Sequence, residues 1–149
     1  VAQNYGAERH DRIRSGIRRT LASNALFCAV ISVLVCAFAE PLMSLFVDAS
    51  SAETIAVGVQ YLRTEGACYI GIGILFMLYG YYRAVNKPMM SVVLTVISLG
   101  TRVLLANVLS PIPGIGVFGI WIAIPIGWLL ADVAGAVYYA VVERKRLAA

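Results

Sequence analysis

The sequence predicts an all-α membrane protein with four transmembrane helices, and three observations lead to that prediction. Hydrophobic residues make up 60% of the 149 residues and charged residues only 13%, whereas about a quarter of the residues in a soluble domain are charged. Uncharged stretches recur at about the 20-residue length that an α-helix needs to cross a bilayer. From Pro88 to Val142 only two side chains are charged, Arg102 and Asp132. A water-soluble protein of this size cannot cover its surface in this way, so lipid must surround most of the chain.

The first helix is predicted over residues 20–39, an uncharged stretch between an arginine and a glutamate. The residues before it, 1–19, are predicted to be a cytoplasmic link. Within that link we expect residues 7–19 to form a short helix on the membrane surface, with Ile13 and Ile17 facing the bilayer.

The second helix is predicted over residues 53–84. Residues 66–82 carry no charge and form its apolar centre. The helix is expected to begin before this centre, because Ser50 and Glu53 match a capping box, with Ser50 as the N-cap and Glu53 at the third helical position.

The third helix is predicted over residues 88–109, because Pro88 fits the first position of a helix. Turn-forming residues follow it: Pro111, Pro113, Gly114 and Gly116. The fourth helix is predicted over residues 118–142, and residues 143–149 form a cytoplasmic tail.

Basic residues alternate along the connections between these helices. They fall in the segment before the first helix, in the turn between the second and third helices, and in the tail: Arg9, Arg12, Arg14, Arg18, Arg19, Arg83, Lys87, Arg144, Lys145 and Arg146. The connection after the first helix carries the acids Asp48 and Glu53, and the one after the third carries no charge. Because basic loops stay in the cytoplasm, this pattern predicts four crossings with both ends inside.

The fourth predicted helix combines a smooth face with a proline. Small residues recur every four positions, at Ala123, Gly127, Ala131 and Gly135. Such a ridge lets another helix approach closely, and packing of this kind drives helix association in lipid. Pro125 removes one backbone hydrogen bond and is expected to bend the helix.

Asp132 is the first candidate for a functional site. It lies about 15 Å from the inner end of its helix, where a carboxylate is costly and must face protein or water. Two interpretations stay open: a structural acid that is neutral or paired with Arg102, or an acid that couples transport to an ion or proton.

Arg102 and Glu65 are the other charged candidates. Both are predicted near the same outer depth, so a structural ion pair between them is one interpretation. The alternative is that Arg102 lines a cavity, where it would repel or orient charged substrates.

The remaining residue types argue against other classes of protein. The three cysteines have no metal-ligand spacing, and the glycines of residues 71–73 lack the strand and lysine of a phosphate-binding loop. We therefore expect no enzymatic activity, no cofactor, no metal site and no nucleic-acid partner.

Three short motifs occur in the same order as in one family of transporters. Residues 3–7 (QNYGA) before an arginine-rich helix, residues 81–88 (YYRAVNKP) and residues 119–128 (GIWIAIPIGW) resemble segments of MATE (multidrug and toxic compound extrusion) transporters. The matches run over nearly the whole chain. The resemblance implies that the chain carries helices nine to twelve, within the C-terminal six-helix bundle of a twelve-helix transporter in the bacterial inner membrane.

The resemblance also implies a function. MATE transporters export cationic or amphipathic compounds, driven by influx of Na⁺ or H⁺, so the implied partners are drug-like cations, the lipid bilayer and the N-terminal helices of the same chain. NorM-like members carry an acid on helix ten, where this sequence has Tyr69–Gly73 and no acid. This departure favours the DinF-like branch, which places the coupling acid in the N-terminal bundle.

Two alternatives to a multidrug exporter stay open. One is a flippase for lipid-linked oligosaccharides from the same superfamily, although its cavity would need several cationic residues and Arg102 is the only deep one. The other is a small four-helix scaffold protein of the membrane.

Overall fold

Residues 1–48 and 50–143 are described by the computed structural model, with the backbone alone for Glu143. Their regular structure is helical throughout. In chain order the elements are α1 (Ala2–Gly6), α2 (His10–Ala37), α3 (Ala39–Ser44), α4 (Ala52–Gly66), α5 (Tyr69–Ala84), α6 (Pro88–Leu109), α7 (Val117–Tyr138) and the π-helical turn η1 (Tyr139–Glu143).

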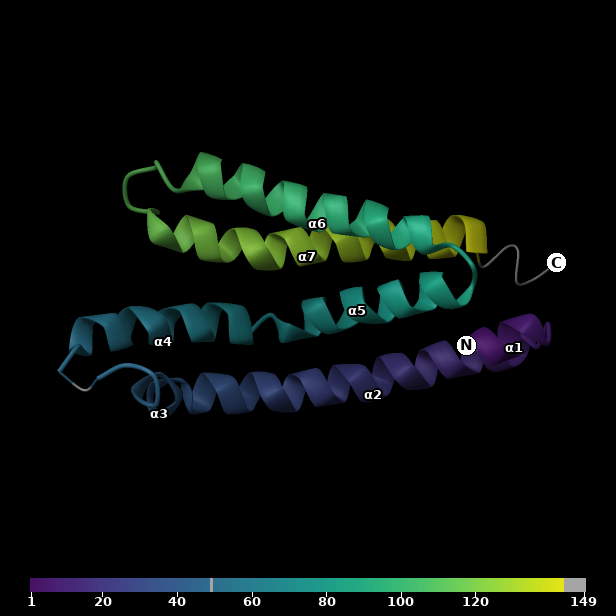
Figure 1. Ribbon diagram of the computed structural model, residues 1–149, viewed down its shortest axis with the longest axis horizontal. Helices are drawn as coiled ribbons and strands as arrows, with labels where there is room; N and C mark the ends of the chain where they lie inside the picture. The colour runs from purple at the N-terminus through teal and green to yellow at the C-terminus, as the bar shows by residue number, and fades with distance from the viewer. Residues whose placement is uncertain (49, 144–149) are drawn as a thin grey trace.

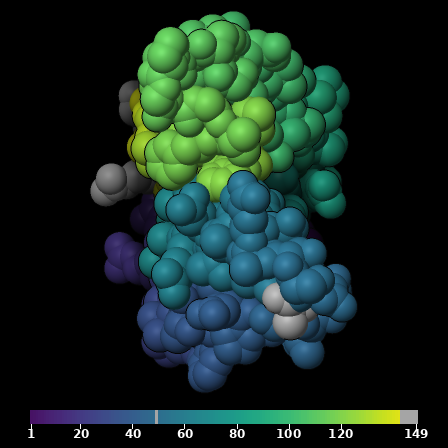
Figure 2. Space-filling model, turned by 90° about the vertical axis from the view of Figure 1, so that its left-hand side faces the viewer, coloured from purple at the N-terminus to yellow at the C-terminus, as the bar shows by residue number. Residues whose placement is uncertain are grey.

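The long helices lie side by side along the length of the molecule (Figure 1). α4 and α5 follow each other end to end and together run the length of the bundle, beside α2 on one side and α7 on the other. The α3–α4 and α6–α7 connections lie at one end, which Figure 2 views face on. The α5–α6 turn lies at the other end with α1.

In the part of the chain that the structure describes, three segments are long and apolar enough to cross a membrane: α2, α6 and residues Val117–Val142. Their large apolar side chains are widely exposed, as at Phe27 of α2 and Val96 of α6, which are 65% and 64% exposed. A surface of this kind is stable in lipid rather than in water. These findings confirm an all-α membrane protein, and the number of crossings stays a prediction.

The single helix predicted over residues 53–84 is wrong, because the structure divides this segment into α4 and α5. The division falls at Ala67 and Cys68, after Gly66, which is a poor helix former. Ser51 precedes α4 without any side-chain cap, so the capping box predicted from Ser50 and Glu53 is also wrong.

The start of the chain differs from prediction as well. The separate surface helix predicted over residues 7–19 is the first part of α2, which continues from His10 to Ala37. Arginine favours the helical conformation, and neither glycine nor proline lies between the arginine-rich segment and the apolar segment that follows it. The helix therefore continues from one segment into the other. Ile13, predicted to face lipid, is completely buried in the protein core.

That core lies where α5 turns into α6. Its buried members come from α2, α5, α6, α7 and the α5–α6 turn: Ile13, Leu75, Leu78, Tyr81, Tyr82, Val85, Leu94, Trp128 and Ala131. Four tyrosines stack edge to face around it, with Tyr81 against Tyr139 and Tyr82 against Tyr138. The best-packed part of the bundle is therefore the end that carries the arginine-rich start of α2 and the α5–α6 turn.

The opposite end is held by a short polar turn. The Ser50 amide donates a hydrogen bond of 2.8 Å to Asp48 Oδ1, and this bond holds the pKa of Asp48 below its ordinary value. The predicted tail residues Arg144, Lys145 and Arg146 lie outside the described residues.

Candidate functional site

Asp132 lies on the buried side of α7. Its side chain is 8% exposed, and Oδ1 is buried without a hydrogen-bond partner in the described part of the chain. It faces α5 at Gly71, where an added Cβ would lie 3.9 Å from Asp132 Oδ2 and 3.6 Å from Trp128 Cβ. A Cβ at this position would make ordinary van der Waals contact with both groups, so the carboxyl group and the indole pack directly against the backbone of α5.

The position of Gly71 within α5 matters for this carboxyl group. α5 begins at Tyr69, so Gly71 lies in its first turn. The first turn of a helix carries unpaired amides and the positive end of the helix dipole. The Gly71 amide, however, already donates to the Cys68 carbonyl oxygen at 2.9 Å, so it is not free to bond the Asp132 carboxyl group.

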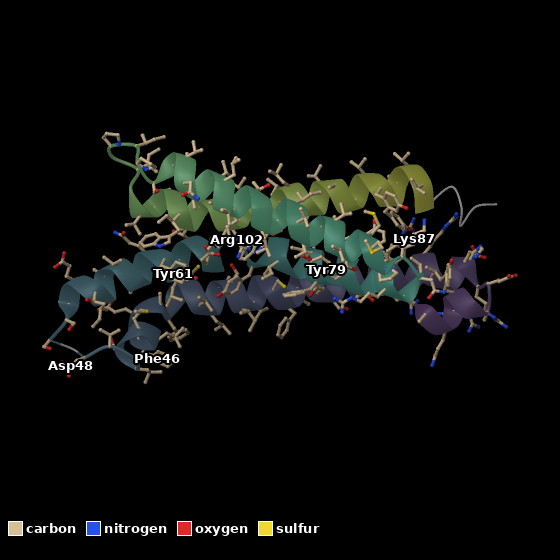
Figure 3. All side chains as sticks on the ribbon, turned by 45° about the horizontal axis from the view of Figure 1, so that its top comes forward. Phe46, Asp48, Tyr61, Tyr79, Lys87 and Arg102 are labelled. Atoms are coloured by element: carbon tan, nitrogen blue, oxygen red, sulfur yellow. The ribbon has the colours of Figure 1, made fainter. Side chains whose placement is uncertain are left out.

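Glu65 and Arg102 form a second group of charges, at the end of α4 and on α6. Glu65 is 4% exposed, and its Oε1 and Arg102 Nε are buried atoms without a hydrogen-bond partner. The two charges are close enough to attract each other, and Arg102 lies midway along the bundle (Figure 3). Yet among the described residues they form no ion pair within 4.0 Å.

The structure therefore brings Glu65 near Arg102 and leaves Asp132 apart from both. The pairing of Asp132 with Arg102, one of the two structural roles considered for this acid, is not seen. The reason is the register of α6 and α7. An added Cβ at Gly127 would lie 3.7 Å from Arg102 Cβ, and Gly127 is five residues, about 7.5 Å, from Asp132 along the helix.

The four small residues of α7 all lie buried within the bundle: Ala123, Gly127, Ala131 and Gly135. A Cβ at Gly127 would lie 2.6 Å from the Ser98 carbonyl oxygen of α6, which is closer than atoms can pack. At Gly135 it would lie 2.7 Å from Leu78 Cδ1 of α5. Pro125 is also buried inside α7, between Ala123 and Gly127 in the sequence.

Several polar contacts between helices were not anticipated. Ser32 Oγ of α2 donates to the Gly66 carbonyl oxygen at the end of α4. Tyr82 Oη donates to the Gly135 carbonyl oxygen at 2.6 Å, and Lys87 Nζ donates to Tyr138 Oη at 3.1 Å. A lone hydroxyl in an apolar stretch was the only signal that the sequence offered for Ser32.

No cluster of three or more metal-ligating side chains occurs in the part of the chain that the structure describes. Among the described residues, Asp132, Glu65 and Arg102 each carry a buried side-chain atom without a hydrogen-bond partner. Such groups inside a membrane protein are expensive and typical of ion or substrate pathways.

Comparison with known proteins gives two findings. The model of the MatE family matches residues 1–108. The chain is also similar to the probable multidrug resistance protein YoeA of Bacillus subtilis (strain 168), with 25% identity over 147 residues. That alignment covers 98% of this chain and 31% of the relative, so the chain spans less than a third of the length of the curated relative that it matches. No solved structure matches the chain.

Proposed function

The chain belongs to the MatE family, as its resemblance to MATE transporters indicated, and we propose that it forms part of a cation-coupled multidrug exporter. The observation that carries this proposal is the family match over residues 1–108, together with the relative named as a probable multidrug resistance protein. The exporter would be a transporter rather than an enzyme, located in the bacterial inner membrane. Its substrates would be cationic or amphipathic drug-like compounds, exchanged for Na⁺ or H⁺.

The proposed arrangement in the membrane is four crossings with both ends in the cytoplasm. α2, α6 and α7 each supply one crossing. α4 and α5 together supply another, because they lie end to end and measure 15 and 16 residues, each too short to cross alone. This arrangement fits helices nine to twelve of a twelve-helix transporter of the DinF-like branch.

Asp132 is proposed as an additional ion- or proton-binding acid in this part of the transporter, beside the main coupling acid that the DinF-like resemblance places in the N-terminal bundle. Its burial, its unpartnered oxygen and its position beside the first turn of α5 support that role. An acid that binds and releases a cation during transport needs such a position between two helices, where its charge affects how they pack.

The experiment is drug efflux by the full-length protein in a strain that lacks its own exporters. Wild type should lower drug sensitivity and export ethidium. Asp132→Asn should abolish energised efflux while membrane levels stay unchanged, and Asp48→Asn, which alters an exposed acid, should leave efflux intact. No efflux by wild type would refute the exporter, whereas full efflux by the Asp132 variant would leave that residue a structural role only.

A further inference from the structure

The junction between α4 and α5 has a backbone unlike that of the long helices around it. The Cys68 amide bonds the Glu65 carbonyl at 3.0 Å, and the Gly71 amide bonds the Cys68 carbonyl at 2.9 Å. Both bonds span three residues rather than four, the pattern of a 3₁₀ turn. Such turns in mid-helix often mark a hinge.

A side chain from another helix completes the hydrogen bonding at this junction. In a continuous helix the Gly66 carbonyl would accept a bond from the amide of Ile70, four residues on. Among the described residues that bond is missing, and Ser32 Oγ of α2 donates to the Gly66 carbonyl instead. Backbone groups freed inside a membrane need a partner of this kind, so Ser32 stabilises the divided form of the helix.

The two halves on either side of the junction are held differently. On the α5 side, Tyr82 bonds the Gly135 carbonyl of α7 within the buried core. On the α4 side, besides the Ser32 bond to Gly66, the hydrogen bonds to α2 lie at one exposed site. There Arg63 Nε donates to the Cys36 carbonyl oxygen at 3.4 Å, and Cys36 Sγ donates to the Arg63 carbonyl oxygen at 3.8 Å. Tyr61 of α4 also packs edge to face against Trp121 of α7. A groove of about 560 Å³ lies beside α4, lined by residues of α3 and α4 such as Glu40 and Arg63. α5 thus belongs to the buried core, whereas the contacts of α4 with α2, α3 and α7 lie outside that core and a groove lies beside it.

We propose that residues 66–68 are a hinge about which α4 swings relative to α5, with the Ser32–Gly66 hydrogen bond as the contact that holds the bent form. The movement changes how far Glu65, at the end of α4, lies from Arg102 on α6. Hinges of this type are a few residues at the ends of elements that absorb the backbone change.

Distance measurement by electron spin resonance tests the hinge in the full-length protein. Spin labels would be attached in lipid nanodiscs, in a cysteine-free background, at the exposed residues Val57 of α4 and Phe76 of α5. The control pair is Met89 and Val108 on the continuous helix α6, which are also exposed and have the same separation of 19 residues. A continuous helix gives about 29 Å for such a pair.

The hinge predicts a wider distance distribution for the Val57–Phe76 pair than for the control pair. Ser32→Ala should shift the first pair toward about 29 Å, because the Gly66 carbonyl then regains the Ile70 amide. Ser32→Thr keeps the hydroxyl and should restore the original distribution.

A Val57–Phe76 distribution as narrow as the control would show a rigid kink and overturn the hinge. If the Ser32→Ala variant does not fold, comparing the two label pairs in the unsubstituted protein still decides whether residues 66–68 form a hinge. No change with Ser32→Ala in a folded protein would overturn the role of Ser32. Transport is not measured, so the hinge and the exporter can fail independently.

Discussion

At the scale of single residues, glycines set how closely the helices of the bundle approach. Gly127 and Gly100 illustrate two extremes, since a Cβ at Gly127 would meet the α6 backbone while one at Gly100 would meet nothing within 4 Å. Both glycines lie within long helices. Their different surroundings allow the packing effect of a methyl group to be separated from its effect on helix propensity.

We predict that Gly127→Ala destabilises the full-length protein by about 1–3 kcal/mol, because the methyl group pushes α6 and α7 apart. Gly100→Ala should be neutral or stabilise by up to about 1 kcal/mol, since alanine favours helix. Thermal unfolding in detergent measures both. Equal unfolding temperatures for the Gly127→Ala and Gly100→Ala variants would contradict the close approach of α6 and α7 at Gly127.

Glu65 and Arg102 give a second prediction at this scale. Loss of either charge leaves the other buried without its attracting group, so Glu65→Gln and Arg102→Gln should each lower membrane levels and stability. The exchanged variant, Glu65→Arg with Arg102→Glu, should restore much of the loss. Membrane yield and unfolding temperature are the measurements, and an exchanged variant no better than either single one would argue against the interaction.

At the scale of elements, both ends of α6 and the start of α7 could be predicted. The end of α7 at Tyr138, before the π-helical turn, and the division between α4 and α5 could not. Pro88 and the turn residues from Pro111 to Gly116 act locally, through fixed backbone angles and missing amides. The division at Ala67 and Cys68 has no proline, and its hydrogen bonding is completed by Ser32, 34 residues away. A contact so distant in sequence leaves no local pattern.

The contacts of the charged residues could not be predicted either, because they too join residues that are distant in the sequence. Composition was enough to single out Asp132, Arg102 and Glu65, because charges are rare in the apolar stretches. Which of them meet depends on the register between helices. Arg102 lies beside Gly127 rather than Asp132, and that register could not be worked out from depth alone.

The α5–α6 turn is an element whose attachment can be tested. Asn86 takes a positive φ of 58°, and the turn is flanked by Tyr82 and Lys87, which both contact α7. We predict that Tyr82→Phe destabilises the protein by about 1 kcal/mol through loss of its bond to the Gly135 carbonyl. Tyr61→Phe, at a half-exposed ring, should change stability by less than about 0.5 kcal/mol. Unfolding in detergent compares the two.

At the scale of the whole molecule, the orientation in the membrane is the main prediction. α1 and the α5–α6 turn share one end of the bundle, and the α3–α4 and α6–α7 connections share the other (Figure 1). Combined with the basic residues at the first end, this predicts that the first end is cytoplasmic.

Single cysteines at exposed sites test this orientation in intact cells. A membrane-impermeant maleimide should label Asp48→Cys and Ile112→Cys, because both lie at the end predicted to face outward. It should label Arg12→Cys only after the cells are opened. Labelling of Arg12→Cys from outside would contradict the predicted topology.

The position of Trp128 against Gly71 and Asp132 has a practical consequence. An indole that is 6% exposed emits light whose colour depends on nearby electric fields, and here the nearest variable field is that of one carboxyl group. With Trp121 and any other tryptophans of the full protein replaced by phenylalanine, the emission of Trp128 would report, without any added dye, the cation or proton binding that we propose for Asp132.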